Sequence, residues 1–183
     1  QPLWATPVRT DTPAAQSDYV PSFVSGNDQI FFRGTILDKA TGNEASAPWG
    51  KDFPLAFAEN IVVTCSATTT CSGWTQEGDE WTNLWTTTTA TQASDGVREN
   101  NLGFAPAGTV VSGSGERTSV LVPTASNELP QIIDIHSGAV TSLSSPDGDA
   151  TDRLVEVASD GFIVFEKSTS RGWVFDSEGN FQS

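Results

Sequence analysis

One phrase of strands and turn recurs along the chain and constrains its fold more than any other feature. It is clearest over residues 29–49, QIFFRGTILDKATGNEASAPW, where two β-rich runs lead into an Asp-Lys-Ala-Thr-Gly turn and then a tryptophan. Asp and Thr favour such turns by hydrogen bonding to nearby backbone, and Gly supplies the positive φ. Repetition at intervals of tens of residues predicts several copies of one small unit.

Pairs of β-rich runs joined by short turns of Gly, Asn or Asp predict a hairpin in each copy. The paired runs are 22–25 with 29–32, 55–58 with 61–64, 102–105 with 109–111, and 155–158 with 162–165. The recurrence of this pattern makes a chance match improbable and predicts an all-β protein.

Further strands are predicted downstream of each hairpin. Third strands are expected at 36–37, 73–75, 132–135 and 173–175, and fourth strands at 80–89, at 139–143 and around 47–49. In three of the units an acid and a glycine delimit the turn after the third strand: Asp38 and Gly42, Asp134 and Gly138, and Asp176 and Gly179. We interpret these residues as structural turn positions.

Four-stranded units of about 40–45 residues with turns rich in Asp and Gly are typical of β-propeller blades. The run Gly34 to Gly42, GTILDKATG, followed by Trp49, resembles the repeat of PQQ-like (quinoprotein-type) propellers. The other units resemble this repeat only loosely. The resemblance implies an all-β fold, either a β-propeller or a partial propeller of about four four-stranded blades.

The resemblance does not extend to an activity. Quinoprotein enzymes of this kind have about eight blades and hold their cofactor on the axis. This chain offers about half that number of blades, and none of its residues matches a cofactor-binding position of the family. We therefore expect no cofactor, no catalytic residues and no metal ligands.

The chain is predicted to form a single propeller-like domain over residues 1–183. Approximate blades span 20–50, 51–92, 98–145 and 150–183, and the last of them lacks an outer strand. Residues 3–8 fit that missing strand as a closing clasp. Pairing with a second copy, or membership of a longer propeller, are the alternatives. Because the chain lacks Met and opens on Gln1, we expect it to be a processed or excised product.

Charge limits the classes of partner. The formal net charge is −14, with 9 basic against 23 acidic residues, so nucleic acids and anionic membranes are repelled. No run of about 18 apolar residues predicts a membrane span. The acidity either keeps a secreted protein soluble or steers a cationic partner.

Cys65 and Cys71 are the only cysteines and lie between two predicted strands. A disulfide that closes this hairpin is geometrically plausible, because paired strands bring such residues close together. A disulfide in a chain without other cysteines indicates an oxidising, extracytoplasmic compartment, either secreted or at the cell surface.

Polar residues at two places in the chain are candidates for a functional site. His136 is the only histidine and lies in a predicted turn, so a surface position is favoured over catalysis. Asp147, Asp149 and Asp152 have a spacing that calcium uses, but the closing Glu of an EF-hand is missing, so a solvated loop is favoured over calcium binding.

Trp74, Trp81 and Trp85 are candidates for an aromatic face on which a sugar could stack. Trp81 and Trp85 are expected on one face if they share a strand, because strand faces alternate with period two. Packing between blades is the favoured interpretation of these side chains.

The sequence thus favours a non-catalytic extracytoplasmic binding or scaffold module over an enzyme. The expected partner is a protein or a glycan, and self-association could complete a propeller. Two alternatives stay open: a fragment or relative of a propeller enzyme (hydrolase or quinoprotein-like) with its site on the axis, and carbohydrate recognition by exposed Trp.

Overall fold

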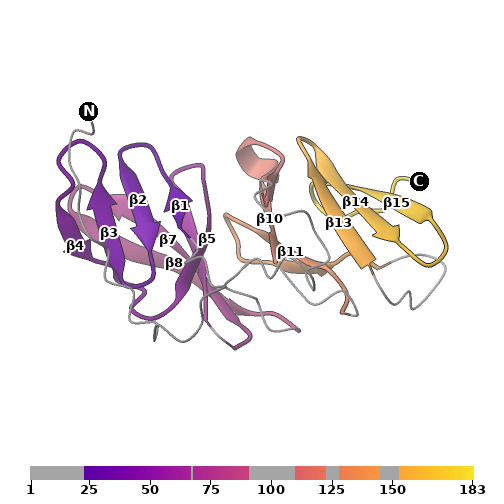
Figure 1. Cartoon of the computed structure of the whole chain (residues 1–183), viewed down its shortest axis with the longest axis horizontal. Coiled ribbons are helices and arrows are strands. Elements are labelled where there is room, and N and C mark those ends of the chain that lie inside the picture. Colours follow the sequence, from indigo (N-terminus) through magenta and orange to yellow (C-terminus); the bar gives the residue numbers. More distant parts are fainter. Residues whose placement is uncertain (1–22, 67, 91–109, 123–127, 145–152) are drawn as a thin grey trace.

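A computed structural model describes residues 23–66, 68–90, 110–122, 128–144 and 153–183 (Figure 1). Expectations for residues 3–8, 102–105 and 147–152 lie outside the described residues. The described part of the chain contains no helix with the length and apolarity needed to cross a bilayer.

Four antiparallel sheets follow one another along the chain, each with its strands in sequence order. Sheet 1 contains β1 (Val24–Ser25), β2 (Gln29–Phe32), β3 (Thr35–Asp38) and β4 (Glu44–Ser46). Sheet 2 contains β5 (Phe53–Ala58), β6 (Ile61–Cys65), β7 (Thr70–Glu77) and β8 (Glu80–Thr88). Sheet 3 contains β9 (Val111–Ser112), β10 (Ser119–Val122), β11 (Gln131–Asp134) and β12 (Val140–Ser142), with a 3-10 turn η1 (Gly115–Arg117) before β10. Sheet 4 contains β13 (Arg153–Ala158), β14 (Gly161–Glu166) and β15 (Arg171–Asp176).

The sheets are arranged as the blades of a partial β-propeller. They lie in a row and do not close into a ring, with sheet 1 at one end and sheet 4 at the other (Figure 1). The first strands of neighbouring sheets approach each other, β1 against β5 and β9 against β13. Meandering sheets that stack through their faces, with first strands innermost, are the architecture of propeller blades.

Apolar side chains between the sheets form three clusters. One cluster lies between sheets 1 and 2, one between sheets 2 and 3, and one between sheets 3 and 4. In β11, Ile132 belongs to the cluster with sheet 4 and Ile133 to the cluster with sheet 2. Because β11 is buried on both faces, its sequence has consecutive apolar residues and does not alternate between apolar and polar ones.

Residues with positive φ allow the chain to reverse direction in two of the hairpin turns. Glu59 and Asn60 both have positive φ, 49° and 63°, which is the type I′ geometry that matches strand twist. Gly34 has φ 74° in the turn between β2 and β3, a conformation that glycine adopts without strain.

The third predicted unit differs from the structure. Residues 109–111 were expected to form its second strand, but Val111 belongs to the first strand, β9, and β10 is the second. The two strands are separated by a longer loop that contains Gly113 and η1, and both Gly113 and the first residue of η1, Gly115, have positive φ, so no tight hairpin marks the boundary. The β10 strand was missed altogether.

The fourth strand of sheet 1 also differs from the expectation. It was placed around 47–49, whereas β4 ends at Ser46 and residues 48–50 form a turn. Trp49 leaves the sheet edge and packs inward, where its ring lies 5.9 Å from Phe31 and 5.4 Å from Trp81. Its indole N–H donates to the Phe32 carbonyl oxygen at 3.1 Å.

The tryptophans of β8 point to opposite faces, so the expectation that Trp81 and Trp85 share a face is wrong. Gly73 pairs with Trp85 but Trp74 pairs with Asn83, which leaves Leu84 as an extra residue in a β-bulge. One extra residue reverses the alternation of side chains. Trp81 therefore packs toward sheet 1 and Trp85 toward sheet 3.

Residues 180–183 pair with the outer edge of β15. The Asp176 N–H donates to the Asn180 carbonyl oxygen at 3.0 Å, and Val174 exchanges two bonds of 2.8 Å with Gln182 and Ser183. Sheet 4 therefore has a short paired segment beyond β15, at the place where the sequence predicts no outer strand.

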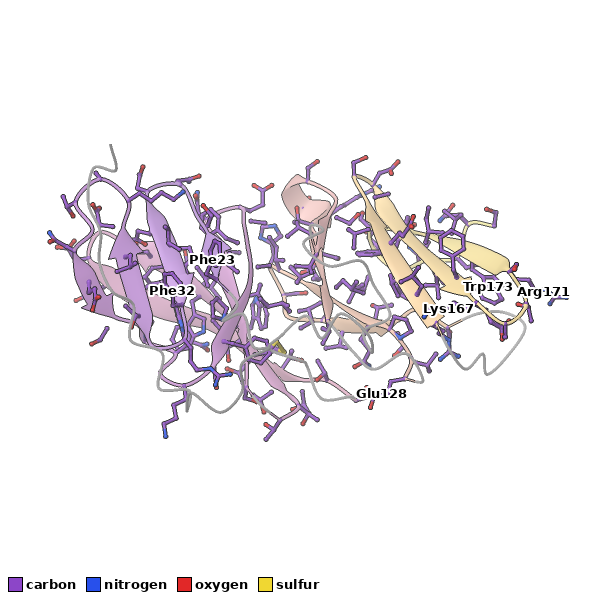
Figure 2. All side chains as sticks on the ribbon, in the orientation of Figure 1. Phe23, Phe32, Glu128, Lys167, Arg171 and Trp173 are labelled. Atoms are coloured by element: carbon purple, nitrogen blue, oxygen red, sulfur yellow. A yellow bond between two sulfur atoms is a disulfide. The ribbon has the colours of Figure 1, made fainter. Side chains whose placement is uncertain are left out.

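The two end sheets keep apolar side chains on their outward faces. Phe23 is 58% exposed and its ring lies 5.9 Å from that of Phe32 (Figure 2). At the other end of the row Val174 is exposed on β15, and Arg171 lies at the outermost point of the same sheet (Figure 2).

Candidate functional site

The Asp38 turn is built by hydrogen bonds to one carboxylate oxygen. The backbone N–H and the hydroxyl of Thr41 both donate to Asp38 Oδ1 at 2.7 Å. The Gly42 N–H donates to the Asp38 carbonyl oxygen at 2.8 Å, and the Asn43 N–H to Thr41 Oγ1 at 3.2 Å. The two bonds that Thr41 donates to the carboxylate, first that of its hydroxyl and then that of its backbone N–H, lower the pKa of Asp38.

The Asp134 turn repeats this network almost bond for bond in sheet 3. Both the N–H and the hydroxyl of Ser137 donate to Asp134 Oδ1 at 2.7 Å, and the Ala139 N–H donates to Ser137 Oγ at 3.2 Å. The Gly138 N–H donates to the Asp134 carbonyl oxygen at 2.9 Å. Ser137 therefore makes the same two hydrogen bonds in its turn as Thr41 makes in the Asp38 turn, although the residue types differ.

The Asp176 turn is a shorter variant. Its Oδ1 accepts the backbone N–H groups of Glu178 and Asn180 at 3.0 and 2.8 Å, and the Gly179 N–H donates to its carbonyl oxygen at 3.0 Å. Burial raises the pKa of Asp176, but the hydrogen bonds from Asn180 and Glu178 outweigh it and the net pKa is lowered.

Cys65 and Cys71 form a disulfide across the paired strands β6 and β7. Both residues are buried at the contact between sheets 2 and 3. The bond therefore stabilises the far end of sheet 2 and takes no part in a surface site.

The three tryptophans that are candidates for sugar stacking are packed between sheets. Trp85 is 9% exposed, and its indole N–H donates to the Ile135 carbonyl oxygen at 2.7 Å. Trp74 donates to Thr64 Oγ1 at 3.0 Å, and Trp81 stacks edge-on to Trp49. No single exposed aromatic face results.

One end of sheets 2 to 4 gathers exposed polar groups around η1. We call it the turn end: the Glu59–Asn60 turn, η1, and the turns after β11 and β15. Glu59 Oε1 accepts the Gly115 N–H at 3.0 Å, so sheet 2 holds the start of η1. His136 Nε2 lies 2.9 Å from the Gly115 carbonyl oxygen, which requires a proton on that nitrogen.

Sheet 4 holds the same loop from the other side. The Gly113 N–H donates to the Ser159 carbonyl oxygen at 2.9 Å, and Arg117 Nε lies 4.0 Å from Glu178 Oε1. The second contact is between exposed side chains and contributes little stability. Three sheets thus fix one exposed loop.

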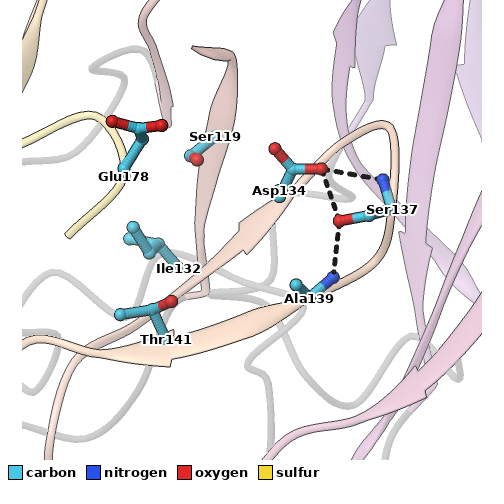
Figure 3. Close-up of a pocket in the computed structure, with 7 residues that line it drawn as sticks. All are labelled: Ser119, Ile132, Asp134, Ser137, Ala139, Thr141 and Glu178. Carbon is cyan, nitrogen blue, oxygen red and sulfur yellow. Dashed lines mark hydrogen bonds between the residues drawn. The ribbon is translucent and has the colours of Figure 1, made fainter. Parts of the chain in front are cut away.

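A pocket of about 220 Å³ opens at the turn end, between sheet 3 and the turn after β15. Its lining mixes carboxylates, hydroxyls and apolar groups from Ser119, Ile132, Asp134, Ser137, Ala139, Thr141 and Glu178 (Figure 3). The sequence pointed to Asp134 alone among these residues, and only as a turn former. Nothing in the spacing of Ser119 or Glu178 signals that they meet.

Metal binding finds no support in the geometry. Among the described residues, no group of three or more His, Cys, Asp or Glu side chains could hold a metal ion. Asp147, Asp149 and Asp152, for which the sequence favours a solvated loop over calcium binding, lie outside the described residues.

No protein-family model and no curated protein matches the chain. Solved structures similar to it include the computationally designed Ika4 protein, at 14% identity and a TM-score of 0.44, over 84% of this chain and 88% of that chain. BamB from Moraxella catarrhalis is similar at 13% identity and a TM-score of 0.39, over 81% of this chain and 49% of that chain. The fold class rests on the four sheets themselves.

Proposed function

We propose that this chain is a non-catalytic scaffold module that works outside the cytoplasm and binds a protein partner at its turn end. The observation that carries the proposal is the exposed η1 loop, whose Gly115 N–H donates to Glu59 of sheet 2 and whose Gly113 N–H donates to the Ser159 carbonyl oxygen of sheet 4. A loop that is ordered before binding loses little entropy when a partner docks.

The chemistry of the turn end supports binding over catalysis. His136, the only histidine of the chain, uses Nε2 to contact the η1 backbone. General acid–base catalysis needs a side chain that can reach a substrate proton. The acidic net charge of −14 favours a partner with a basic surface.

The extracytoplasmic part of the proposal is supported by the disulfide, because such bonds persist in oxidising compartments. Alkylation of intact cells before and after reduction measures the state of Cys65 and Cys71. We expect modification only after reduction, and alkylation of both thiols without reductant would place the protein in a reducing compartment.

Site-specific photo-crosslinking tests the binding surface. A photoreactive residue at Glu116 in η1 is expected to give one discrete cross-linked product in cells that produce the protein. The matched control is Ser168, an exposed residue of the turn between β14 and β15 at the opposite end of the sheets. Equal products from both positions, or none from position 116, would exclude the turn end as the binding surface.

A further inference from the structure

The pocket at the turn end contains a buried hydroxyl that the fold does not use. Ser119 is 3% exposed, lines the pocket, and its hydroxyl makes no hydrogen bond within the described residues. Figure 3 shows it between Glu178 and Asp134. Buried hydroxyls are normally hydrogen-bonded, to protein or to water, so this group is available to a ligand that replaces water.

Two carboxylates flank this hydroxyl with acceptor capacity to spare. Asp134 uses Oδ1 for its turn, and its other oxygen accepts no hydrogen bond within the described residues; Figure 3 shows that oxygen on the side of Ser119. Within the described residues, the carboxylate of Glu178 has only a 4.0 Å contact with the exposed Arg117. The polar side of the pocket therefore offers acceptors and negative charge.

The opposite side of the pocket is apolar. It is formed by Ile132, Ala139 and the methyl-bearing Thr141, which lie on the face of sheet 3 that packs against sheet 4. A lysine side chain has this same division, with four methylenes and a compact ammonium that carries three donors. An arginine would present a planar fork, which pairs best with one carboxylate in a bidentate geometry.

We propose that the pocket receives a lysine side chain of the partner protein. Its methylenes contact Ile132, and its ammonium donates to the Ser119 hydroxyl and to the carboxylates of Asp134 and Glu178. This assignment rests on the proposed function, because it names the chemistry of the partner that docks at the turn end.

Amide chemical-shift perturbation with three short peptides tests the proposal. The probes are acetyl-Gly-Lys-Gly-amide and its norleucine and acetyl-lysine analogues, titrated into the uniformly labelled full chain. The lysine peptide is expected to shift the amides of Ser119, Thr141 and Glu178 saturably. The two analogues are expected to bind about tenfold more weakly, because they lack the charged donors.

Variants separate the pocket from the general acidity of the protein. Ser119→Ala and Glu178→Gln are each expected to weaken binding of the lysine peptide about threefold to tenfold, because the first removes an acceptor of the ammonium and the second removes a negative charge beside it. Asp160→Asn is the matched control, since it removes one exposed carboxylate of the same end outside the pocket. Retained amide spectra confirm that the variants are folded.

Three outcomes would overturn the lysine assignment. They are equal shifts with the norleucine peptide, equal losses in Glu178→Gln and Asp160→Asn, and saturation of the same amides by calcium chloride at lower concentration than by the peptide. A cross-link from position 116 without any effect of the lysine peptide would refute this inference and leave the proposed function standing.

Discussion

Replacing Trp85 by phenylalanine tests whether the contact between sheets 2 and 3 depends on one side chain. The indole N–H donates at 2.7 Å to the Ile135 carbonyl oxygen, which accepts no other hydrogen bond within the described part of the chain. Leaving a buried carbonyl without a donor costs about 1–3 kcal/mol. The hydrogen bond alone therefore predicts a measurable loss.

Packing adds to this loss because the ring fills the space above two glycines. A Cβ built at Gly73 would lie 2.3 Å from Cε2 of Trp85, and a Cβ built at Gly138 would lie 2.7 Å from its Cδ2. The smaller phenyl ring leaves part of that space empty. Since removal of a whole buried aromatic side chain costs about 3–5 kcal/mol, we expect Trp85→Phe to lower the free energy of unfolding by about 2–4 kcal/mol.

Urea unfolding followed by far-ultraviolet circular dichroism measures the change without relying on tryptophan fluorescence. Trp81→Phe is the control on the same strand, because Trp81 is only partly buried and its indole N–H has no hydrogen bond within the described residues. The control is expected to lose about 1 kcal/mol, mainly in ring contacts. Equal losses in the two variants, or a loss below about 1 kcal/mol for Trp85→Phe, would refute the reasoning.

Three further changes have defined outcomes. Gly138→Ala should lower the free energy of unfolding in urea by about 2 kcal/mol, because φ is 73° and the new methyl group meets the indole above it. Replacing both Cys65 and Cys71 by Ala should cost about 2 kcal/mol in the same assay, the loop-closure value for a sequence separation of 6. The folded-state pKa values of Asp38 and Asp176 are lowered, so the stability they contribute is present above about pH 4 and is lost as pH falls through those values. Thermal melts from pH 5 downward should therefore fall less steeply in the double Asn variant, and parallel profiles would contradict this assignment.

The parts of the fold that follow local rules could be predicted from the sequence. The hairpin turns at Glu59–Asn60 and the Asp38 and Asp134 turns depend on residues within a few positions of one another. Their hydrogen bonds form inside the turn, so residue type and spacing are sufficient.

Features that depend on register or on contacts between sheets could not be predicted. The bulge at Leu84 changes the face of Trp85 without any local mark, since either neighbour could have been the extra residue. The β10 strand follows a loop whose shape depends on Glu59 and Ser159 of other sheets. The pocket could not be predicted for the same reason, because Ser119 and Asp134 belong to sheet 3 and Glu178 follows the last strand of sheet 4.

The pairing of residues 180–183 with β15 has a kinetic consequence for any strand that joins sheet 4. The backbone groups of Val174 and Asp176 that face outward are already bonded. An edge whose donors and acceptors are satisfied does not act as a template for another chain. A competing strand from another molecule must wait for this segment to detach. As the concentration of the competing strand increases, its observed rate of association will reach a limit equal to the rate at which residues 180–183 detach.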